Sequence, residues 1–287
     1  MYEKVRNKFQ LDVKEVIDVE DSNSSTVYKC VLMSGESVYV KIPFSQLKWQ
    51  REWEAYDVLK NHVAIPNLLA SWAGDEAFPG AFLLSSLKGK PLHETASLNV
   101  SYQVGQLLAN LHEVKPPKPY TYTGIRNEYE GWYTFLTKQF STFAEDVKTV
   151  LPQELFDQCV EKFYLEINQL PKPDGPSFVH MDFRPANILV DGDEVVGVID
   201  FESVRFGAVE LDFVKIYRDF LQDDEERFIA FKKGYASIRT LPDLSIFLPF
   251  YSFMDAFNSI GWCVRRGREN HQAFLAENIE IIRSYFK

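Results

Sequence analysis

Cysteine is scarce in this chain. Its 287 residues contain three cysteines, Cys30, Cys159 and Cys263, which are widely spaced and form no C-x-x-C pair. An odd number at this spacing disfavours both a disulfide framework and a zinc site. We therefore expect three buried, reduced thiols.

Long apolar runs are also missing. No stretch approaches the roughly 18 apolar residues that a membrane-spanning helix needs. Residues 1–14 are charged throughout and lack the apolar segment of a secretion signal. The sequence therefore predicts a cytoplasmic protein without a membrane partner.

Basic residues are too few to balance the acidic ones, and the formal net charge is −10. Nucleic acids and anionic membranes bind surfaces with a surplus of Lys and Arg, so we expect neither as a partner. A cationic small molecule suits this charge, although an acidic balance is also common in cytoplasmic proteins. The hydrophobic content of 46% is sufficient for one large core or two smaller ones and excludes a disordered chain.

The N-terminal part has the pattern of a small sheet. Short strand patterns at 16–19, 26–32 and 37–42 precede a helical pattern over 46–61. Two further apolar runs, at 68–72 and 80–85, bring the predicted antiparallel sheet to about five strands.

The remainder is mostly helical. The short polar segment 86–91 has the Gly and Pro expected of a connection between lobes. Helical patterns follow at 100–112, 151–170 and 246–287, and strands return only within 178–201. We therefore predict two domains, with boundaries at 1–87 and 88–287.

The strands of 178–201 end in polar residues. His180-x-Asp182-x-x-x-x-Asn187 occupies a loop between two of them, and Asp200 directly follows an apolar strand. Phosphoryl transfer needs its phosphate charge neutralised and a hydroxyl held in line. Because Mg²⁺ prefers oxygen ligands, a carboxylate and an amide suit the metal, while a second carboxylate can accept the hydroxyl proton. A polar turn between core strands is the alternative.

This pattern, followed by Ile199-Asp200-Phe201-Glu202, resembles the aminoglycoside phosphotransferase and choline kinase family, relatives of the protein kinases. The resemblance covers nearly the whole chain. It implies an α+β, bilobal protein-kinase-like fold: an N-terminal lobe with a five-stranded antiparallel sheet plus one helix, and a mostly helical C-terminal lobe with a small β-hairpin carrying the catalytic and metal loops. The implied roles are catalytic base for Asp182, magnesium ligands for Asn187 and Asp200, and support of the catalytic loop for His180 and Asp212.

The same resemblance implies a nucleotide site in the N-terminal part. Lys41, embedded in an apolar strand, would contact the α- and β-phosphates, and matching the next helix to the family pattern selects Glu52 over Glu54 as its partner. The turn 20–25 contains no glycine, unlike the G-x-G-x-x-G loop of protein kinases, and offers hydroxyl groups instead. The adenine would bond to backbone groups within 82–87. The predicted nucleotide-binding residues are Lys41, Glu52, Ser24, Ser25, Ser85 and Leu87.

Two segments combine acids with aromatic rings, one at 128–133 and one in the C-terminal helical region. Carboxylates and aromatic faces together suit an ammonium group. The alternative is an amphipathic helix with an aromatic core face. The candidate acceptor-binding residues are Glu128, Glu130, Trp132, Asp255 and Trp262.

The sequence thus predicts a small-molecule kinase that uses ATP, with GTP as an alternative, and Mg²⁺. It would transfer the γ-phosphoryl group to a hydroxyl of a small cationic, aminoglycoside-like acceptor. A metabolic kinase for choline, ethanolamine, homoserine or a sugar, a macrolide kinase and a catalytically silent binding module are the alternatives. A protein kinase is disfavoured because Glu202 replaces the glycine of D-F-G and the stretch from Asp200 to Asp212 is too short for an activation loop. A monomer and a homodimer both remain open.

Overall fold

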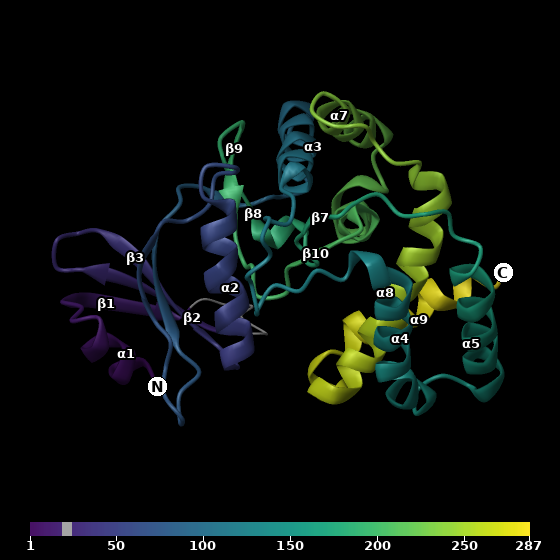
Figure 1. Ribbon diagram of the computed structural model, residues 1–287, viewed down its shortest axis with the longest axis horizontal. Helices are drawn as coiled ribbons and strands as arrows, with labels where there is room; N and C mark the ends of the chain where they lie inside the picture. Colours follow the sequence, from purple (N-terminus) through teal and green to yellow (C-terminus); the bar gives the residue numbers. More distant parts are fainter. Residues whose placement is uncertain (19–24) are drawn as a thin grey trace. The chain divides into compact units, whose positions relative to one another are not determined.

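The computed structural model describes residues 1–18 and 25–287 (Figure 1). They form two compact units. The first consists of Met1–Asn127, Ser177–Phe206 and Lys215–Thr240, and the second of Glu128–Pro176, Gly207–Val214 and Leu241–Lys287. This division by packing is distinct from the predicted functional boundary between residues 87 and 88, which stays a prediction. No helix in the described part of the chain has both the length and the apolar composition of a membrane span.

The first unit contains the predicted five-stranded sheet, with all neighbouring strands antiparallel and the order β1-β2-β3-β5-β4. Residues alternate between the two faces of a strand, so Val38, Val40 and Ile42 point into one core while Lys41 lies on the opposite face. The strands are β1 Val13–Asp18, β2 Ser25–Leu32, β3 Ser37–Pro43, β4 Leu68–Trp72 and β5 Ala81–Ser85.

One face of this sheet is covered by helix α1, Tyr2–Lys8, which the sequence analysis missed. Val5 is fully buried in one cluster with Cys30 and Val40, and Tyr2 and Phe9 pack against that cluster. The signal was present, because Tyr2, Val5 and Phe9 share one helical face. It was hidden by the charged residues between them.

Helix α2, Gln46–Leu59, confirms the predicted helix and packs against strand β3 of the sheet (Figure 1). The Ser45 side chain accepts a hydrogen bond from the Lys48 N–H and caps its first turn. The Trp49 ring stacks on Phe82 of β5, with centroids 5.6 Å apart. This packing fixes the rotation of the helix and therefore the direction in which Glu52 points.

A smaller β-structure carries the loops of the predicted site. Strands β8, Ile188–Asp191, and β9, Glu194–Val198, form the predicted hairpin. Strand β7, Ser177–Val179, pairs with β10, Arg205–Gly207, and strand β6, Lys90–Pro91, pairs with β8. The sequence analysis expected only a connection at Lys90–Pro91 and missed β10, because strands of two or three residues have no readable period.

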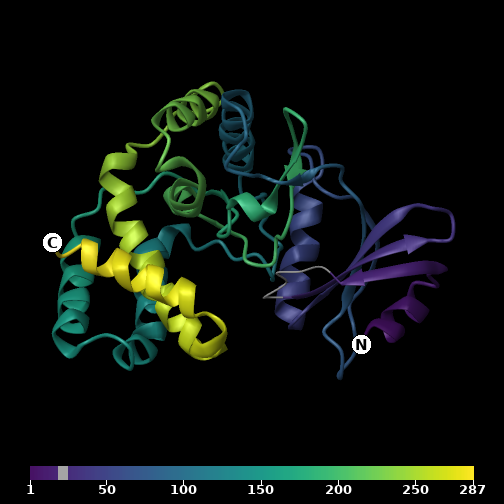
Figure 2. The same cartoon turned by 180° about the vertical axis from the view of Figure 1, so that it is seen from behind.

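Helices α3, Leu98–Glu113, and α7, Glu225–Ala236, lie side by side in the first unit (Figures 1 and 2). Their backbones approach closely at two glycines. A Cβ atom on Gly105 would lie 2.1 Å from the carbonyl oxygen of Phe231, and one on Gly234 would lie 1.8 Å from that of Tyr102. Glycine is therefore required at both positions for this packing. The short helix α6, Phe213–Ile216, continues into the π-helical segment η4, Tyr217–Leu221.

The second unit is helical, and Figure 2 shows α8 and α9 beside each other within it. Phe140 of α4 stacks on Phe163 of α5 at 4.0 Å and on Phe257 of α8 at 4.1 Å, which joins three helices in one aromatic core. Gly267, with a φ of +95°, ends α8 and divides the predicted helical stretch 246–287. The helices are α4 Trp132–Lys148, α5 Gln153–Ile167, α8 Leu244–Arg266 and α9 Gln272–Ser284.

We predict that Gly105→Ala lowers the free energy of unfolding by about 1–3 kcal/mol, because its methyl group overlaps the backbone of α7. Chemical denaturation followed by circular dichroism measures this change. Gly131→Ala is the matched control, since a Cβ atom there meets nothing within 4 Å. Equal stability of the two variants would contradict the close packing of α3 and α7.

Candidate functional site

The predicted catalytic loop connects β7 to the hairpin. His180 is fully buried, and its Nδ1 accepts a hydrogen bond from the backbone N–H of Asp182 at 3.3 Å. Its Nε2 therefore carries the proton and donates to the carbonyl oxygen of Ile199 at 3.0 Å. This histidine thus ties the loop to the end of the strand that precedes Asp200, which is consistent with its predicted supporting role.

Asp182 lies at the centre of this loop with both carboxylate oxygens engaged. Its Oδ2 accepts from Nδ2 of Asn187 at 3.0 Å and from Nε of Arg184 at 3.3 Å, while its Oδ1 accepts from Nζ of Lys215 at 2.6 Å. Burial by itself raises the pKa of Asp182, but Lys215 and Arg184 outweigh it and hold the pKa below the usual range. Asp182 is therefore a carboxylate at neutral pH, as a proton acceptor must be. Neither cation was predicted from the sequence.

Two residues of the site have left-handed backbones without being glycine: Met181 at a φ of +69° and Asp200 at +72°. Such conformations cost free energy and persist where the surrounding structure enforces them. Met181 directly precedes Asp182, and Asp200 directly follows Ile199, whose carbonyl oxygen accepts the hydrogen bond from His180. The backbone strain therefore coincides with the two loops in which the sequence placed the chemistry.

Lys41 forms the most buried charged contact of the site. Its Nζ lies 2.8 Å from Oε2 of Glu52 and 2.7 Å from Oδ1 of Asp200, and its side chain is 7% exposed. Burial lowers the pKa of Lys41, but Asp200 and Glu52 more than compensate, so the pKa is raised and the ammonium stays charged. The predicted Lys41–Glu52 ion pair is confirmed.

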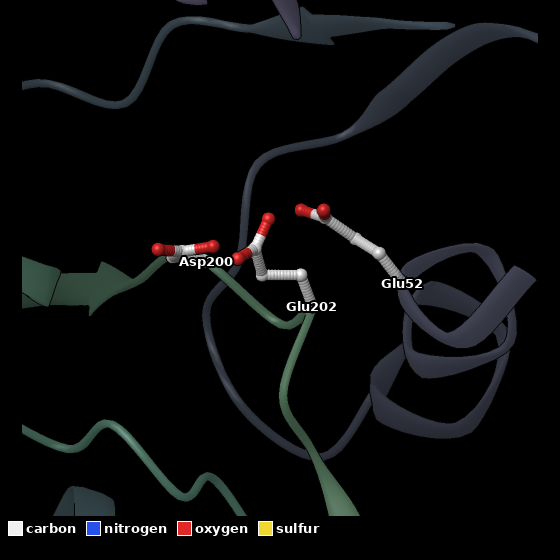
Figure 3. A group of neighbouring side chains, drawn as sticks. All are labelled: Glu52, Asp200 and Glu202. Atoms are coloured by element: carbon white, nitrogen blue, oxygen red, sulfur yellow. The ribbon is translucent and has the colours of Figure 1, made fainter. Parts of the chain in front are cut away.

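A third carboxylate joins this group. One carboxylate oxygen from each of Glu52, Asp200 and Glu202 lies within 4.8 Å of the other two, and Figure 3 shows the Glu202 carboxylate between the other two carboxylates. Lys48 of α2 pairs with Glu202 Oε1 at 2.8 Å, whereas the buried Oε2 has no hydrogen-bond partner within residues 1–18 and 25–287. The sequence analysis noted Glu202 only as a departure from D-F-G and did not include it in the site.

The oxygen atoms of Asp200 and Asn187 fit Mg²⁺, because that cation prefers hard oxygen ligands. Asp200 contributes a partly exposed carboxylate, and Asn187 donates through Nδ2 to Asp182, which leaves its amide oxygen as the atom that could bind a metal. The backbone N–H of Ile199 also donates to the carbonyl oxygen of Asn187 at 3.0 Å and holds the two predicted ligands in adjacent segments. Their roles as magnesium ligands stay predictions.

Glu54, the other glutamate of α2, has a different task. Its buried carboxylate accepts hydrogen bonds from the backbone N–H groups of Thr123, Gly124 and Ile125 at 2.7–3.1 Å. Arg51 adds bonds to the carbonyl oxygens of Gly124 and of Glu202. Helix α2 is thus anchored at several points, which keeps Glu52 beside Lys41.

The remaining predicted nucleotide residues have less distinctive surroundings. Ser25 is buried at the start of β2 opposite Pro43, and Ser24 lies outside the described residues. The Ser85 hydroxyl accepts from the backbone N–H of Asn67, and Leu87 is half-buried. The contacts of these residues with a nucleotide stay predictions.

The acceptor candidates all belong to the second unit. Trp132 is buried, and its indole N–H donates to the hydroxyl of Tyr251 at 2.8 Å, which favours the alternative of a core aromatic residue. Glu130 is exposed, whereas Glu128, Asp255 and Trp262 are half-buried. Asp212 is buried in the turn η3, Val209–Asp212. Binding of an acceptor, and support of the catalytic loop by Asp212, stay predictions.

The profile of the phosphotransferase enzyme family matches residues 15–245, which is most of the chain. The chain belongs to the phosphotransferase enzyme family. Sequence comparison with curated proteins gave no match. Family membership makes this phosphotransferase a relative of small-molecule kinases. The buried Lys41 and the two loops that carry Asp182 and Asp200 are consistent with this membership.

Solved structures share the fold at low sequence identity. The GDP and kanamycin complex of APH(2")-IIia has a TM-score of 0.77 at 14% identity, covering 99% of this chain and 97% of that one. Macrolide 2'-phosphotransferase MphH from Brachybacterium faecium has a TM-score of 0.71 at 15% identity, with 97% and 95% covered. A thermostable mutant of APH(4)-Ia, in ternary complex with AMP-PNP and hygromycin B, has a TM-score of 0.74 at 17% identity, with 98% and 97% covered. The predicted kinase-like fold is confirmed.

We predict that Glu54→Gln lowers the free energy of unfolding by about 1–3 kcal/mol at neutral pH, because an amide oxygen replaces a charged acceptor of several N–H groups. Burial raises the pKa of Glu54, but hydrogen bonds from Gln50 and the backbone outweigh it and lower the pKa. The stabilisation is therefore present above the unfolded pKa of about 4.3 and is lost as the pH falls through the folded pKa.

Urea denaturation of both proteins between about pH 7 and about pH 4 measures this dependence. The difference between wild type and variant should shrink toward the acid end. Glu36→Gln, in the exposed turn after β2, is the control and should change little. A difference that grows on acidification would contradict the anchoring role of the carboxylate.

Proposed function

We propose that this phosphotransferase transfers the γ-phosphoryl group of ATP to a hydroxyl of a small molecule, with Mg²⁺ as the metal and GTP as an alternative donor. The convergence of Lys41, Glu52 and Asp200, at distances of 2.7–2.8 Å, carries the proposal. It places one cation and one accessible carboxylate together, as a metal-bound triphosphate requires. The nucleotide complexes among the solved relatives support the same cofactor class.

In the proposed reaction Lys41 binds the α- and β-phosphates, and Glu52 holds its ammonium in place. Asp200 and Asn187 hold the metal, which when bound neutralises the phosphate charge and orients the γ-phosphoryl group. The acceptor oxygen bonds to the γ-phosphorus as the bond to the β–γ bridging oxygen breaks, and ADP leaves. The hydroxyl proton passes to Asp182, whose lowered pKa suits a proton transfer late in the reaction.

The anchoring of α2 supports an enzyme that needs no activating step. In regulated protein kinases, catalysis depends on bringing the strand lysine and the helix glutamate together. In this chain the pair is formed, and Glu54 and Arg51 fix the helix to the segment 123–125. We therefore propose constitutive activity.

A small cationic, aminoglycoside-like acceptor is the proposed substrate class. This class is supported by the net charge of −10. It is also supported by three acids that are at least partly exposed, Glu128, Glu130 and Asp255, and by the half-buried ring of Trp262. The kanamycin and hygromycin B complexes of solved relatives are consistent with this class. A macrolide is the second candidate, favoured by the fold shared with MphH.

The proposal assigns nucleotide binding to residues 1–87 and the catalytic and acceptor-binding parts to residues 88–287. It further places the enzyme in the cytoplasm. Choline, ethanolamine, homoserine and sugars are the metabolic alternatives to an antibiotic, and a catalytically silent binding module is the alternative to an enzyme.

We predict that Asp182→Asn lowers kcat by about 10²-fold or more, because the amide cannot accept the hydroxyl proton, while Mg·ADP binding is retained. The assay measures ADP and GDP release from Mg·ATP and Mg·GTP with aminoglycosides, macrolides, choline, ethanolamine, homoserine and sugars. Asp223→Asn, at an exposed position before α7, is the control and should leave turnover unchanged. Full activity of Asp182→Asn would refute the assigned base, and nucleotide binding without turnover of any acceptor would favour the silent module.

A further inference from the structure

The two oxygens of Asp182 differ in the room they leave for a substrate. From the residues that the structure describes, Oδ2 already accepts two hydrogen bonds, from Asn187 and Arg184, whereas Oδ1 accepts one, from Lys215 at 2.6 Å. A carboxylate oxygen has two lone-pair sites, so Oδ1 has one left. An acceptor hydroxyl that gives its proton to Asp182 must therefore donate to Oδ1, beside Lys215.

This geometry puts a fixed cation next to the reacting group. Two donors that share one carboxylate oxygen in its two lone-pair directions lie about 5 Å apart. The group on the carbon next to the reacting hydroxyl therefore comes within reach of the Lys215 ammonium. A hydroxyl or carboxylate oxygen there can accept a hydrogen bond from Lys215, whereas an ammonium group meets a like charge.

Arg184 adds to the preference for an oxygen atom over an ammonium group. Its guanidinium lies on the other oxygen of Asp182, and the side chains of Arg184 and Lys215 are 36% and 27% exposed. Both cations are thus partly accessible at the rim of the predicted base, in the same compact unit. The predicted base is thus flanked by two cations, one on each of its carboxylate oxygens.

We propose that Lys215 is a specificity-determining residue that selects acceptors with an oxygen atom, and no ammonium group, on the carbon next to the reacting hydroxyl. The inference rests on the proposed function, because it takes Asp182 as the base. The inference narrows the substrate class: vicinal diols and 2-hydroxy acids are accepted as substrates, whereas choline and ethanolamine are not. A cationic acceptor is compatible when its ammonium groups lie farther from the reacting hydroxyl.

The test compares wild type with Lys215→Met and Lys215→Arg. Each acceptor is tested as a matched pair that consists of a diol and the corresponding vicinal amino alcohol. The pairs are built on every scaffold that the acceptor panel shows to be phosphorylated. Glycerol, glycolate, choline and ethanolamine are tested as well. The assays run near neutral pH, where the amine is protonated, and report kcat and KM separately. Lys233→Met, which removes an exposed charge from α7, is the matched control. Mg·ADP binding shows that each variant is folded.

We expect wild type to prefer the diol by at least about 10-fold in kcat/KM, as a like charge near the reacting oxygen predicts. Lys215→Met should reduce this preference to within about threefold, while Lys215→Arg and Lys233→Met keep it. A preference unchanged in Lys215→Met, with kcat lowered equally for both acceptors, would show that Lys215 only holds Asp182 and would overturn the inference. Equal kcat/KM values of the wild type for amino alcohols and for diols would also overturn the inference.

Failure of the proposed function gives a different result. If Asp182→Asn keeps full turnover, or if no acceptor is phosphorylated, the assigned base or the kinase activity itself is wrong, and the inference falls with it. If Asp182→Asn is inactive and the Lys215 variants do not change selectivity, the kinase stands and only the role of Lys215 is rejected.

Discussion

The buried ammonium of Lys41 is the point from which the rest of the site is organised. A charge taken out of water costs several kcal/mol unless it is paired, and here Glu52 and Asp200 pair with it from two different segments. Removing one partner of such a buried pair typically costs about 3–5 kcal/mol. The β3 strand, helix α2 and the segment after β9 are therefore held to one another by a single side chain. Lys41 needs Glu52 beside it, and the aromatic packing of α2 together with the hydrogen bonds of Glu54 holds Glu52 in that position.

A second constraint concerns the backbone. Met181 and Asp200 adopt left-handed conformations that non-glycine residues avoid, and the hydrogen bonds from His180 to Ile199 and from Ile199 to Asn187 hold the two loops together. Strain of this kind is maintained where the positions of side chains matter more than stability. The first unit thus holds Met181, next to Asp182, and Asp200 in backbone conformations that the surrounding structure enforces.

Much of this could be predicted from the sequence because the signals were local. The apolar run around Val38, Val40 and Ile42 predicted the strand that carries Lys41. The loop motif predicted that Asp182 and Asn187 lie in one loop near Asp200, whereas their roles as base and metal ligands come from the family resemblance and stay predictions. The choice of Glu52 over Glu54 needed the family pattern, since both glutamates are buried and a helical period alone does not separate them.

The features that were missed depend on contacts between distant segments. Lys215 follows Asp182 by 33 residues and Lys48 precedes Glu202 by 154, so neither ion pair has a local signature. Strands β6 and β10 exist only through their partners, and the burial of Trp132 depends on Tyr251 of another helix. Acceptor specificity belongs to the same class of property, since it arises from side chains that the fold brings together.

The most direct test of the site is a crystal structure with AMP-PNP and Mn²⁺ in place of Mg²⁺, using the anomalous signal of manganese to locate the metal. The predicted result is a peak bound by an oxygen of Asp200 and the amide oxygen of Asn187, with the phosphates against Lys41. A metal bound elsewhere, or a nucleotide that leaves the Lys41 ammonium without a phosphate contact, would contradict the assignment of this site.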